Sequence, residues 1–286
     1  MKKILILTDF SGPSKNAGKY AISLASAYNS EIIIANAFFV PSEAKMATRV
    51  VWPLVDYATL SRESYSDLER FSKTLIKSDK HEADKPESNI ELESRPGSIL
   101  EVSSDLVLEK QIDLVIMGMV GAGFLPQLIF GSNCRTMIAK ATFPVLYIPD
   151  GIRFKVIKTI AFATDLDFGD IKVIKAIVSL LGRPHIQIRL IHVSKKEISP
   201  ASNKAVHIEV FLKEIKENIS NVNVTYDGVS DIDVEDGLQW LTTEFKIDVL
   251  AMVHRQHSFI SRLFQGSHTQ RISRLAEIPL LVLPSR

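Results

Sequence analysis

Residues 112–149 contain a strand, a glycine loop, a helix and a second strand in immediate succession: IDLVIMGMVGAGFLPQLIFGSNCRTMIAKATFPVLYIP. The apolar run Asp113–Gly118 predicts a buried strand, and a loop with several glycines follows it. Residues 132–140 then predict a helix, and residues 143–148 a second apolar strand. Strands that are apolar on both faces and joined by helices pair in parallel, so this stretch indicates an α/β protein.

The same alternation extends back to the start of the chain. The apolar run Ile4–Leu7 predicts a strand that ends at Thr8-Asp9, and apolar residues at helical spacing follow from Ala17 to Tyr28. Further strands are predicted at 32–35 and 90–94, and helices at 61–78 and from Pro96 to Lys110. Residues 1–150 therefore predict a parallel sheet covered by helices.

Residues 151–286 repeat this order, which indicates a duplicated domain. Thr8-Asp9 recurs as Thr164-Asp165 at an offset of 156, and Ile112-Asp113 recurs as Ile247-Asp248 at an offset of 135. The change of offset places 21 extra residues in the first half, and we assign them to the irregular stretch 38–60. The predicted domains are residues 1–150 and 151–286.

Composition excludes several classes of protein. The chain has 286 residues, a formal net charge of +1 and 46% hydrophobic residues, so a packed core is expected and general binding to nucleic acid or to a membrane surface is not. A single cysteine, Cys134, excludes disulfides and suits a reducing compartment. Apolar runs are too short for a signal peptide or a membrane helix, so we expect a cytoplasmic protein.

The glycine loop predicts an anion site. Gly118 and Gly121 follow the strand, and Gly131-Ser132 opens the next helix. Glycine allows close backbone approach to a ligand, and the amides of Ser132 and Asn133 at a helix N-terminus attract a phosphate. Ligands of open parallel sheets bind at the carboxyl ends of the strands, where Asp9 and Ala37 also lie. The alternative is a purely structural turn with Ser132 as the helix cap.

The loop and its surroundings resemble those of the universal stress protein family. Residues 118–132 match the family motif G-x2-G-x9-G-S/T at every fixed position. The resemblance spans both halves and implies two tandem Rossmann-like domains, each with a five-stranded parallel sheet between helices. It also implies that the first domain binds ATP or a related adenine nucleotide, with or without Mg²⁺, through Asp9, Ala37, Gly118, Gly121, Gly131, Ser132 and Asn133. Asn36-Ala37 departs from the His-Val often found in the family, which His192-Val193 retains.

The second half has lost most of the motif. At an offset of 135, Val253 replaces Gly118 and Gln256 replaces Gly121, while Gly266-Ser267 remains. We therefore predict that the second domain binds ATP poorly or not at all. His254, His257 and His268 lack metal-ligand spacing, and we predict a solvated basic loop and no metal site.

Three classes of function remain open. The first is a binding module in which ATP reports stress or energy status; the second is a slow ATPase; the third is a scaffold without nucleotide. No catalytic residue is predicted, because no general base lies near the expected γ-phosphate.

Cys134 is predicted to be structural. The aromatic residues of 38–60 either pack normally or cover the nucleotide. The last strands, 145–148 and 280–283, are expected at sheet edges, where they would pair the two domains or two chains.

Overall fold

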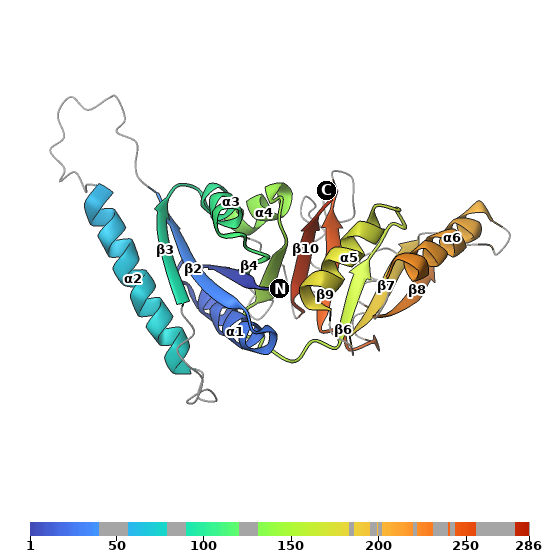
Figure 1. Ribbon diagram of the computed structural model, residues 1–286, viewed down its shortest axis with the longest axis horizontal. Helices are drawn as coiled ribbons and strands as arrows, with labels where there is room; N and C mark the ends of the chain where they lie inside the picture. Colours follow the sequence, from blue (N-terminus) through green and yellow to red (C-terminus); the bar gives the residue numbers. More distant parts are fainter. Residues whose placement is uncertain are drawn as a thin grey trace, which may run out of the picture.

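The computed structural model shows a single ten-stranded sheet in the order β3-β2-β1-β4-β5-β10-β9-β6-β7-β8 (Figure 1). The residues that the structure describes are 1–39, 57–78, 90–119, 131–182, 186–194, 199, 202–219, 222–230, 240, 244–255 and 278–285.

The first half contributes five parallel strands. They are β1 (Lys3–Leu7), β2 (Glu31–Phe38), β3 (Ile90–Pro96), β4 (Leu114–Met119) and β5 (Val145–Pro149). Its helices are α1 (Gly12–Tyr28), α2 (Tyr57–Ser78), α3 (Ile99–Lys110) and α4 (Ser132–Lys140). The order β3-β2-β1-β4-β5 brings the ends of β2, β1 and β4 side by side, which is where the predicted site residues lie.

The second half repeats the parallel arrangement. Its strands are β6 (Thr159–Ala163), β7 (Gln187–Ser194), β8 (Asn223–Ser230), β9 (Val249–His254) and β10 (Leu280–Pro284). Its described helices are α5 (Asp170–Leu181) and α6 (Asn203–Asn218). The prediction of a tandem α/β fold is confirmed.

The last strands of the two halves, β5 and β10, join the sheets. They pair antiparallel, with Tyr147 opposite Leu280 and Leu146 opposite Leu281. All four side chains are at least nine-tenths buried. Because this pair is antiparallel, the carboxyl ends of the strands in the two halves point to opposite edges of the sheet.

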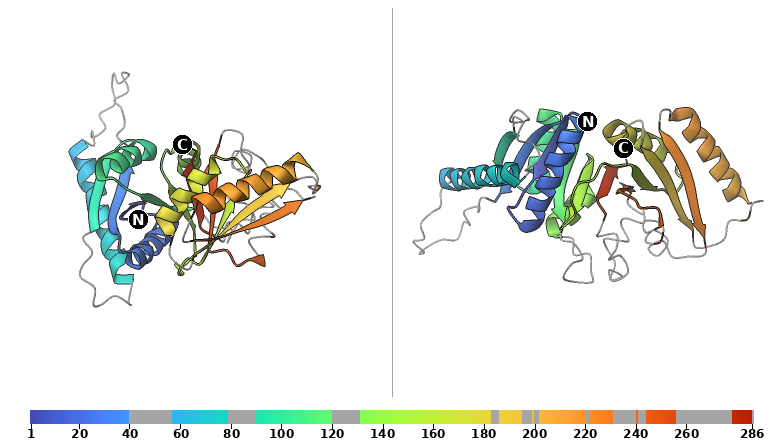
Figure 2. Two further views of the ribbon diagram at one scale, coloured as in Figure 1. Left: turned by 45° about the vertical axis from the view of Figure 1, so that its right-hand side comes forward. Right: turned by 90° about the horizontal axis from the view of Figure 1, so that it is seen from below.

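Helices of the first half lie on both faces of the sheet (Figures 1 and 2), and two apolar cores fill the space between the helices and the strands. One core includes apolar side chains of α1, α2, α5 and α6, and the other includes those of α3 and α4. Alternate residues of the central strands supply the two cores: in β4, Ile116 joins the first and Val115 the second. This alternation explains why the central strands β1, β4, β5, β9 and β10 are apolar on both faces.

The repeated Ile-Asp pair has a structural role. Oδ2 of Asp113 accepts hydrogen bonds from the amides of Lys2 and Lys3 at 2.5 and 3.0 Å. Oδ2 of Asp248 accepts the equivalent bonds from Lys158 and Thr159 at 2.8 and 2.9 Å. Each aspartate therefore fixes the start of the first strand of its half.

One predicted helix start is wrong. Pro96 ends β3 instead of beginning α3, because Ser98 caps that helix and Glu101 bonds back to the Ser98 amide in a capping box. Such a box fixes the helix start after its serine. The irregular stretch 38–60 includes Phe38 in β2 and residues 57–60 in α2, while 40–56 lie outside the described residues.

Candidate functional site

The β1–α1 loop shapes one side of the candidate site. The hydroxyl of Thr8 accepts a hydrogen bond from the Phe10 amide at 2.9 Å and lies 3.0 Å from the hydroxyl of Ser14. Phe10 has a φ of 64°, in the left-handed region that non-glycine residues rarely adopt. Ser11 caps α1 by accepting from the Ser14 amide at 3.3 Å. This turn places Asp9 on the surface at the carboxyl end of β1.

Asp9 is fixed as an ionised hydrogen-bond acceptor. Its Oδ1 accepts from the Ser11 hydroxyl at 2.5 Å and from the Ser11 amide at 3.1 Å. Partial burial raises the pKa of Asp9, but these hydrogen bonds outweigh it and hold the pKa below its ordinary value. The side chain is therefore a carboxylate at neutral pH, suited to accept hydrogen bonds from a ligand hydroxyl or amine.

A chain of buried side chains supports this loop from below. The Asn36 amide donates to the Thr8 carbonyl at 2.7 Å, and its Oδ1 accepts from the Ser64 hydroxyl at 2.8 Å. The Ser64 hydroxyl lies 2.6 Å from that of Ser94. In the sequence, Asn36 stands out only as a departure from the family pattern. A polar residue at the end of an apolar strand was the signal for its role.

Gly118 is required by packing against the protein itself. A Cβ atom at this position would lie 2.4 Å from the Pro13 carbonyl oxygen and 2.7 Å from the Ser14 amide nitrogen. Real Cβ contacts are never this short, so the missing side chain lets α1 begin directly against the end of β4. The structural interpretation of this glycine is therefore supported, alongside its place at the candidate site.

The start of α4 presents exposed amides at the same edge of the sheet. Gly131 is the N-cap and no side chain caps the helix, so the alternative in which Ser132 serves only as the helix cap does not apply. Ser132 and Asn133 are the first two helical residues; both are exposed, and the first turn holds no acidic side chain. Amides in a first turn have no acceptor within their helix, and they favour an anion.

Cys134 links α4 to the other parts of the site. Its thiol donates to the Gly118 carbonyl at 3.6 Å. Burial, together with the nearby charge of Asp9, raises the pKa of Cys134 to about 11. The thiol is therefore protonated at neutral pH, which supports the structural role that the sequence predicted. The contact and the electrostatic effect together show that Asp9, Gly118 and the start of α4 are neighbours.

Most predicted site residues meet at this one edge. Asp9, Ala37 and Gly118 lie at the ends of the adjacent strands β1, β2 and β4, and Gly131, Ser132 and Asn133 begin α4. Ala37 is half-buried against the core that α3 and α4 share. Gly121, with residues 120–130, lies outside the described residues.

The second domain repeats the supporting loop. The Thr164 hydroxyl accepts from the Leu166 amide at 2.8 Å, and Leu166 has a φ of 63°. His192 stands in the position of Asn36, with Nδ1 2.9 Å from the Thr164 carbonyl oxygen. The loop geometry is therefore a property of the fold that both copies keep, whether or not they share a ligand.

An ion pair occupies the corresponding edge of the second domain. Arg255, directly after β9, pairs with the buried carboxylate of Asp170 and lies 3.4 Å from Asp167. Asp170 also accepts from the Thr164 hydroxyl at 2.6 Å. Burial raises the pKa of Asp170, and the bonds from Thr164 and Arg255 only partly offset this effect. Ser14, an uncharged residue, holds the equivalent position in the first domain.

Replacement of Gly118 by Val253 accompanies a changed helix start. Helix α1 begins at Gly12, but α5 begins at Asp170, two residues later by the offset of 156. The turn before it has short-range bonds, from the Asp170 amide to Asp167 and from the Ile171 amide to Phe168. Val253 has a side chain where Gly118 has none, so the end of β9 lacks the space that lets α1 begin against β4.

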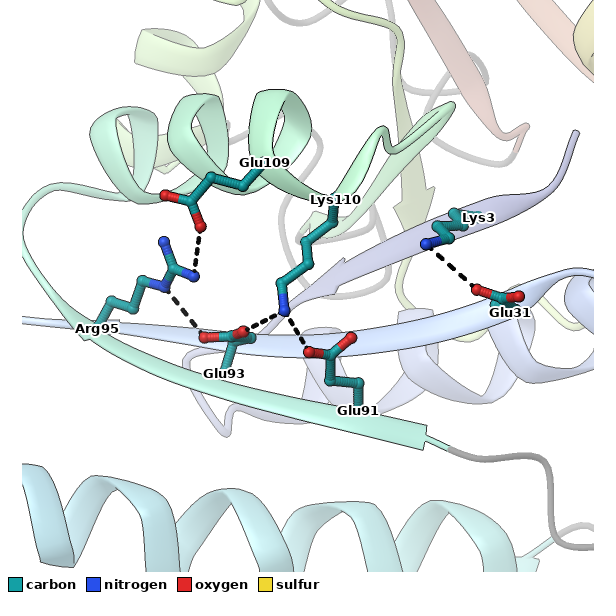
Figure 3. A network of polar contacts seen from close by, with 7 residues as sticks. All are labelled: Lys3, Glu31, Glu91, Glu93, Arg95, Glu109 and Lys110. Carbon is teal, nitrogen blue, oxygen red and sulfur yellow. Dashed lines mark hydrogen bonds and ion pairs between the residues drawn. The ribbon is translucent and has the colours of Figure 1, made fainter.

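Charged side chains on β3 and α3 form a second polar cluster (Figure 3). Arg95 bonds to Glu93 at 3.0 Å and to Glu109 at 2.8 Å, and Lys110 pairs with Glu91 and Glu93. Partial burial raises the pKa of Glu93, but bonds from Arg95 and Lys110 hold it below its ordinary value. The ion pairs tie β3 to α3, and charged side chains are typical of an outer strand, where they disfavour pairing with other chains.

No set of three histidine, cysteine, aspartate or glutamate side chains within the described ranges could hold a metal ion. The described helices also include none with the length and apolar character needed to cross a membrane. Of the three histidines considered for a metal, only His254 lies in the described part of the chain; His257, His268, Gln256 and Gly266-Ser267 fall outside it.

Sequence comparison agrees with the architecture. The model of the universal stress protein family matches residues 1–149 and, separately, residues 157–284. The chain belongs to the universal stress protein family. Universal stress protein MJ0531 of Methanocaldococcus jannaschii is 26% identical over 147 residues, which are 51% of this chain and 81% of that protein.

Solved structures of other universal stress proteins share the tandem fold. A universal stress protein from Archaeoglobus fulgidus superposes with a TM-score of 0.66 at 16% identity, over 99% of this chain and 98% of its own. A putative universal stress protein from Pseudomonas aeruginosa gives a TM-score of 0.59 at 14% identity, over 99% and 93%. At these identities the likeness concerns the fold alone.

Proposed function

We propose that the chain is a cytoplasmic, ATP-binding regulatory protein of the stress response with one competent nucleotide site. We place this site in a first domain, residues 1–150, at the edge formed by Asp9, Ala37, Gly118 and the start of α4. The second domain, residues 151–286, serves as a pseudo-partner without a nucleotide of its own. Binding of ATP would bias the conformation or the assembly of the chain.

The exposed start of α4 is the observation that carries the proposal. Ser132 and Asn133 present first-turn amides without a capping side chain or a nearby acidic residue on the same turn. They follow Gly131, where a Cβ atom would have nothing within 4 Å. An open helix N-terminus preceded by glycine suits a phosphate group.

The other parts of the edge suit the rest of a nucleotide. Asp9 is an exposed, ionised acceptor for a ribose hydroxyl or a base amine, and Ala37 offers a small apolar surface at the end of β2. We expect Gly121, in the same loop as Gly118, to approach the phosphates. Among the site residues that we predict, Asp9 is the one carboxylate. If Mg²⁺ binds with the nucleotide, the phosphates and water would therefore supply most of its ligands.

The ion pair of the second domain supports a single site. Arg255 is held by Asp170 and Asp167, and Val253 replaces the glycine that ends the fourth strand. A polar network that already satisfies itself leaves less room and less charge for a triphosphate. We therefore expect one ATP for each chain.

The two alternative functions, a slow ATPase and a scaffold without nucleotide, can be distinguished from this proposal by experiment. Native mass spectrometry of the full chain with micromolar ATP should show one bound nucleotide. Two bound nucleotides would contradict the proposal that the second domain binds no nucleotide. The absence of any bound nucleotide would favour a scaffold that does not bind nucleotide. A slow ATPase would release phosphate in parallel, which a coupled phosphate assay detects; without a general base we expect no release above the rate for free ATP.

A further inference from the structure

Two histidines from different elements hold the β6–α5 loop, residues 164–169. His192 of β7 places Nδ1 2.9 Å from the Thr164 carbonyl oxygen, and His207 of α6 places Nε2 2.8 Å from the Leu166 carbonyl oxygen. A carbonyl only accepts, so both ring nitrogens donate. Leu166 has a φ of 63°, and a residue in this region persists only where its surroundings hold it. These two histidine contacts, which we call the clamps of the loop, hold its carbonyl groups, while the Thr164 hydroxyl holds the Leu166 amide and Asp170.

The surroundings of His192 disfavour a second proton on its ring. Its side chain is 6% exposed, and its Nε2 atom is buried without a hydrogen-bond partner among the described residues. With Nδ1 donating to Thr164, Nε2 is the unprotonated nitrogen of a neutral ring. Protonation there would add both a charge and an N–H group that no described side chain or carbonyl accepts.

The charges around His192 act mostly in the same direction. Burial lowers the pKa of His192, and the charges of Lys204 and His207 on α6 lower it further. The Thr164 carbonyl and Asp165 of the loop oppose this effect. On the α5 side of the loop, Asp167 and Asp170 are engaged with Arg255.

The first domain has the same clamp without a titrating group. The Asn36 amide donates to the Thr8 carbonyl at 2.7 Å, and its oxygen accepts from Ser64 at 2.8 Å. An amide does not titrate between pH 5 and 8, whereas histidine does. The two loops therefore differ in their response to acid although their hydrogen-bond patterns agree.

We propose that the second domain is an acid-responsive half of the chain, in which protonation of His192 releases the loop 164–169 while Asn36 keeps the first-domain loop closed. The open loop accepts the proton more readily, because a released His192 titrates near the ordinary value of about 6.5. Above this pH the clamp is intact. As the pH falls, the equilibrium moves toward the open loop by up to about tenfold for each pH unit, until the pKa of the closed state is reached.

Hydrogen exchange of the full-length chain without nucleotide tests this proposal. Mass spectrometry at pH 7.5, 6.5 and 5.5, with exchange times corrected for intrinsic rates, compares peptides over residues 159–182 and 3–28. Between pH 7.5 and 5.5 we expect the amide of Leu166 and its neighbours to lose up to about tenfold in protection, with about fivefold of this loss between pH 6.5 and 5.5. The first-domain peptide should remain unchanged. Equal pH dependence in both peptides, or none in 159–182, would overturn the proposal.

Two reciprocal variants identify the titrating group. His192→Asn installs the residue of the first domain and should abolish the acid response, while Asn36→His should transfer it to residues 3–28. A response that survives His192→Asn would place the titrating group elsewhere and overturn the proposal. If His192→Asn fails to fold by circular dichroism at pH 7.5, carbon NMR of His192 in the wild-type chain decides. A folded-state pKa at or above about 6.5 would then overturn it.

Discussion

Replacement of Asn133 by aspartate tests whether the start of α4 binds phosphate. Asn133 is the second residue of α4 and is exposed, and the first turn of this helix has no acidic residue. The substitution adds one negative charge with almost no change in volume. A negative charge in a first turn stabilises a helix by about 0.3–1 kcal/mol, so the melting temperature should stay the same or rise slightly.

The expected effect on ATP binding has the opposite sign. For a phosphate oxygen about 5 Å from the new carboxylate and an effective dielectric constant of about 40, the repulsion is about 1.7 kcal/mol for each unit of charge. This corresponds to about a 16-fold increase in the dissociation constant. Because exposed charges are screened, the effect should shrink as the salt concentration rises.

Isothermal titration calorimetry of the full chain with ATP measures this change, at low and at high salt. The matched control is Asn203→Asp, which places the same charge on the exposed first residue of α6, a helix that also lacks an acidic first turn. Asn203→Asp should raise the melting temperature as slightly as Asn133→Asp does, and it should leave the dissociation constant for ATP unchanged. Unchanged ATP affinity in Asn133→Asp, with binding otherwise intact, would refute a phosphate site at α4.

Other substitutions probe the features that distinguish the two domains. Gly118→Ala should lower the free energy of unfolding by about 1–3 kcal/mol, because its Cβ would lie 2.4 Å from the Pro13 oxygen. Gly131→Ala, at an open N-cap position, should cost less, below about 1 kcal/mol from the poorer cap. Equal losses of stability in both variants would show that the backbone of Pro13 adapts to the added Cβ atom. Arg255→Ala should destabilise the chain by about 3 kcal/mol in urea unfolding, since it leaves the buried Asp170 carboxylate unpaired. The double variant Arg255→Ala/Asp170→Ser should recover most of the lost free energy of unfolding. If Arg255→Ala alone is as stable as the wild type, the ion pair does not stabilise the fold.

Much of the fold could be predicted because local patterns and global architecture agree. Strands buried on both faces are apolar throughout, and the helices between them have apolar residues at helical spacing. The repeated Thr-Asp and Ile-Asp pairs marked the duplication, and both proved to anchor loops or strand starts in each half. Pro96 misled the prediction because a proline fits the end of an outer strand as well as a first helical turn.

The candidate site was predictable only in part. The ends of β1, β2 and β4 had to meet once the sheet was parallel with β1 between β2 and β4, so Asp9, Ala37 and Gly118 could be grouped in advance. The support under this edge was not predictable. Asn36 and Ser64 are 28 residues apart, and their hydrogen bond depends on how α2 packs against the sheet.

The sequence alone determined that this chain is a duplicated α/β protein with one intact glycine motif, because periodicity, repeated residue pairs and motif spacing are properties of the chain itself. Only the tertiary structure decided why Gly118 must be glycine and how the second copy differs. Both depend on contacts between distant residues: Gly118 faces the backbone of Pro13, and Arg255 pairs with Asp170, 85 residues away. Such contacts are set by the register and packing of the strands and helices, which no local pattern records.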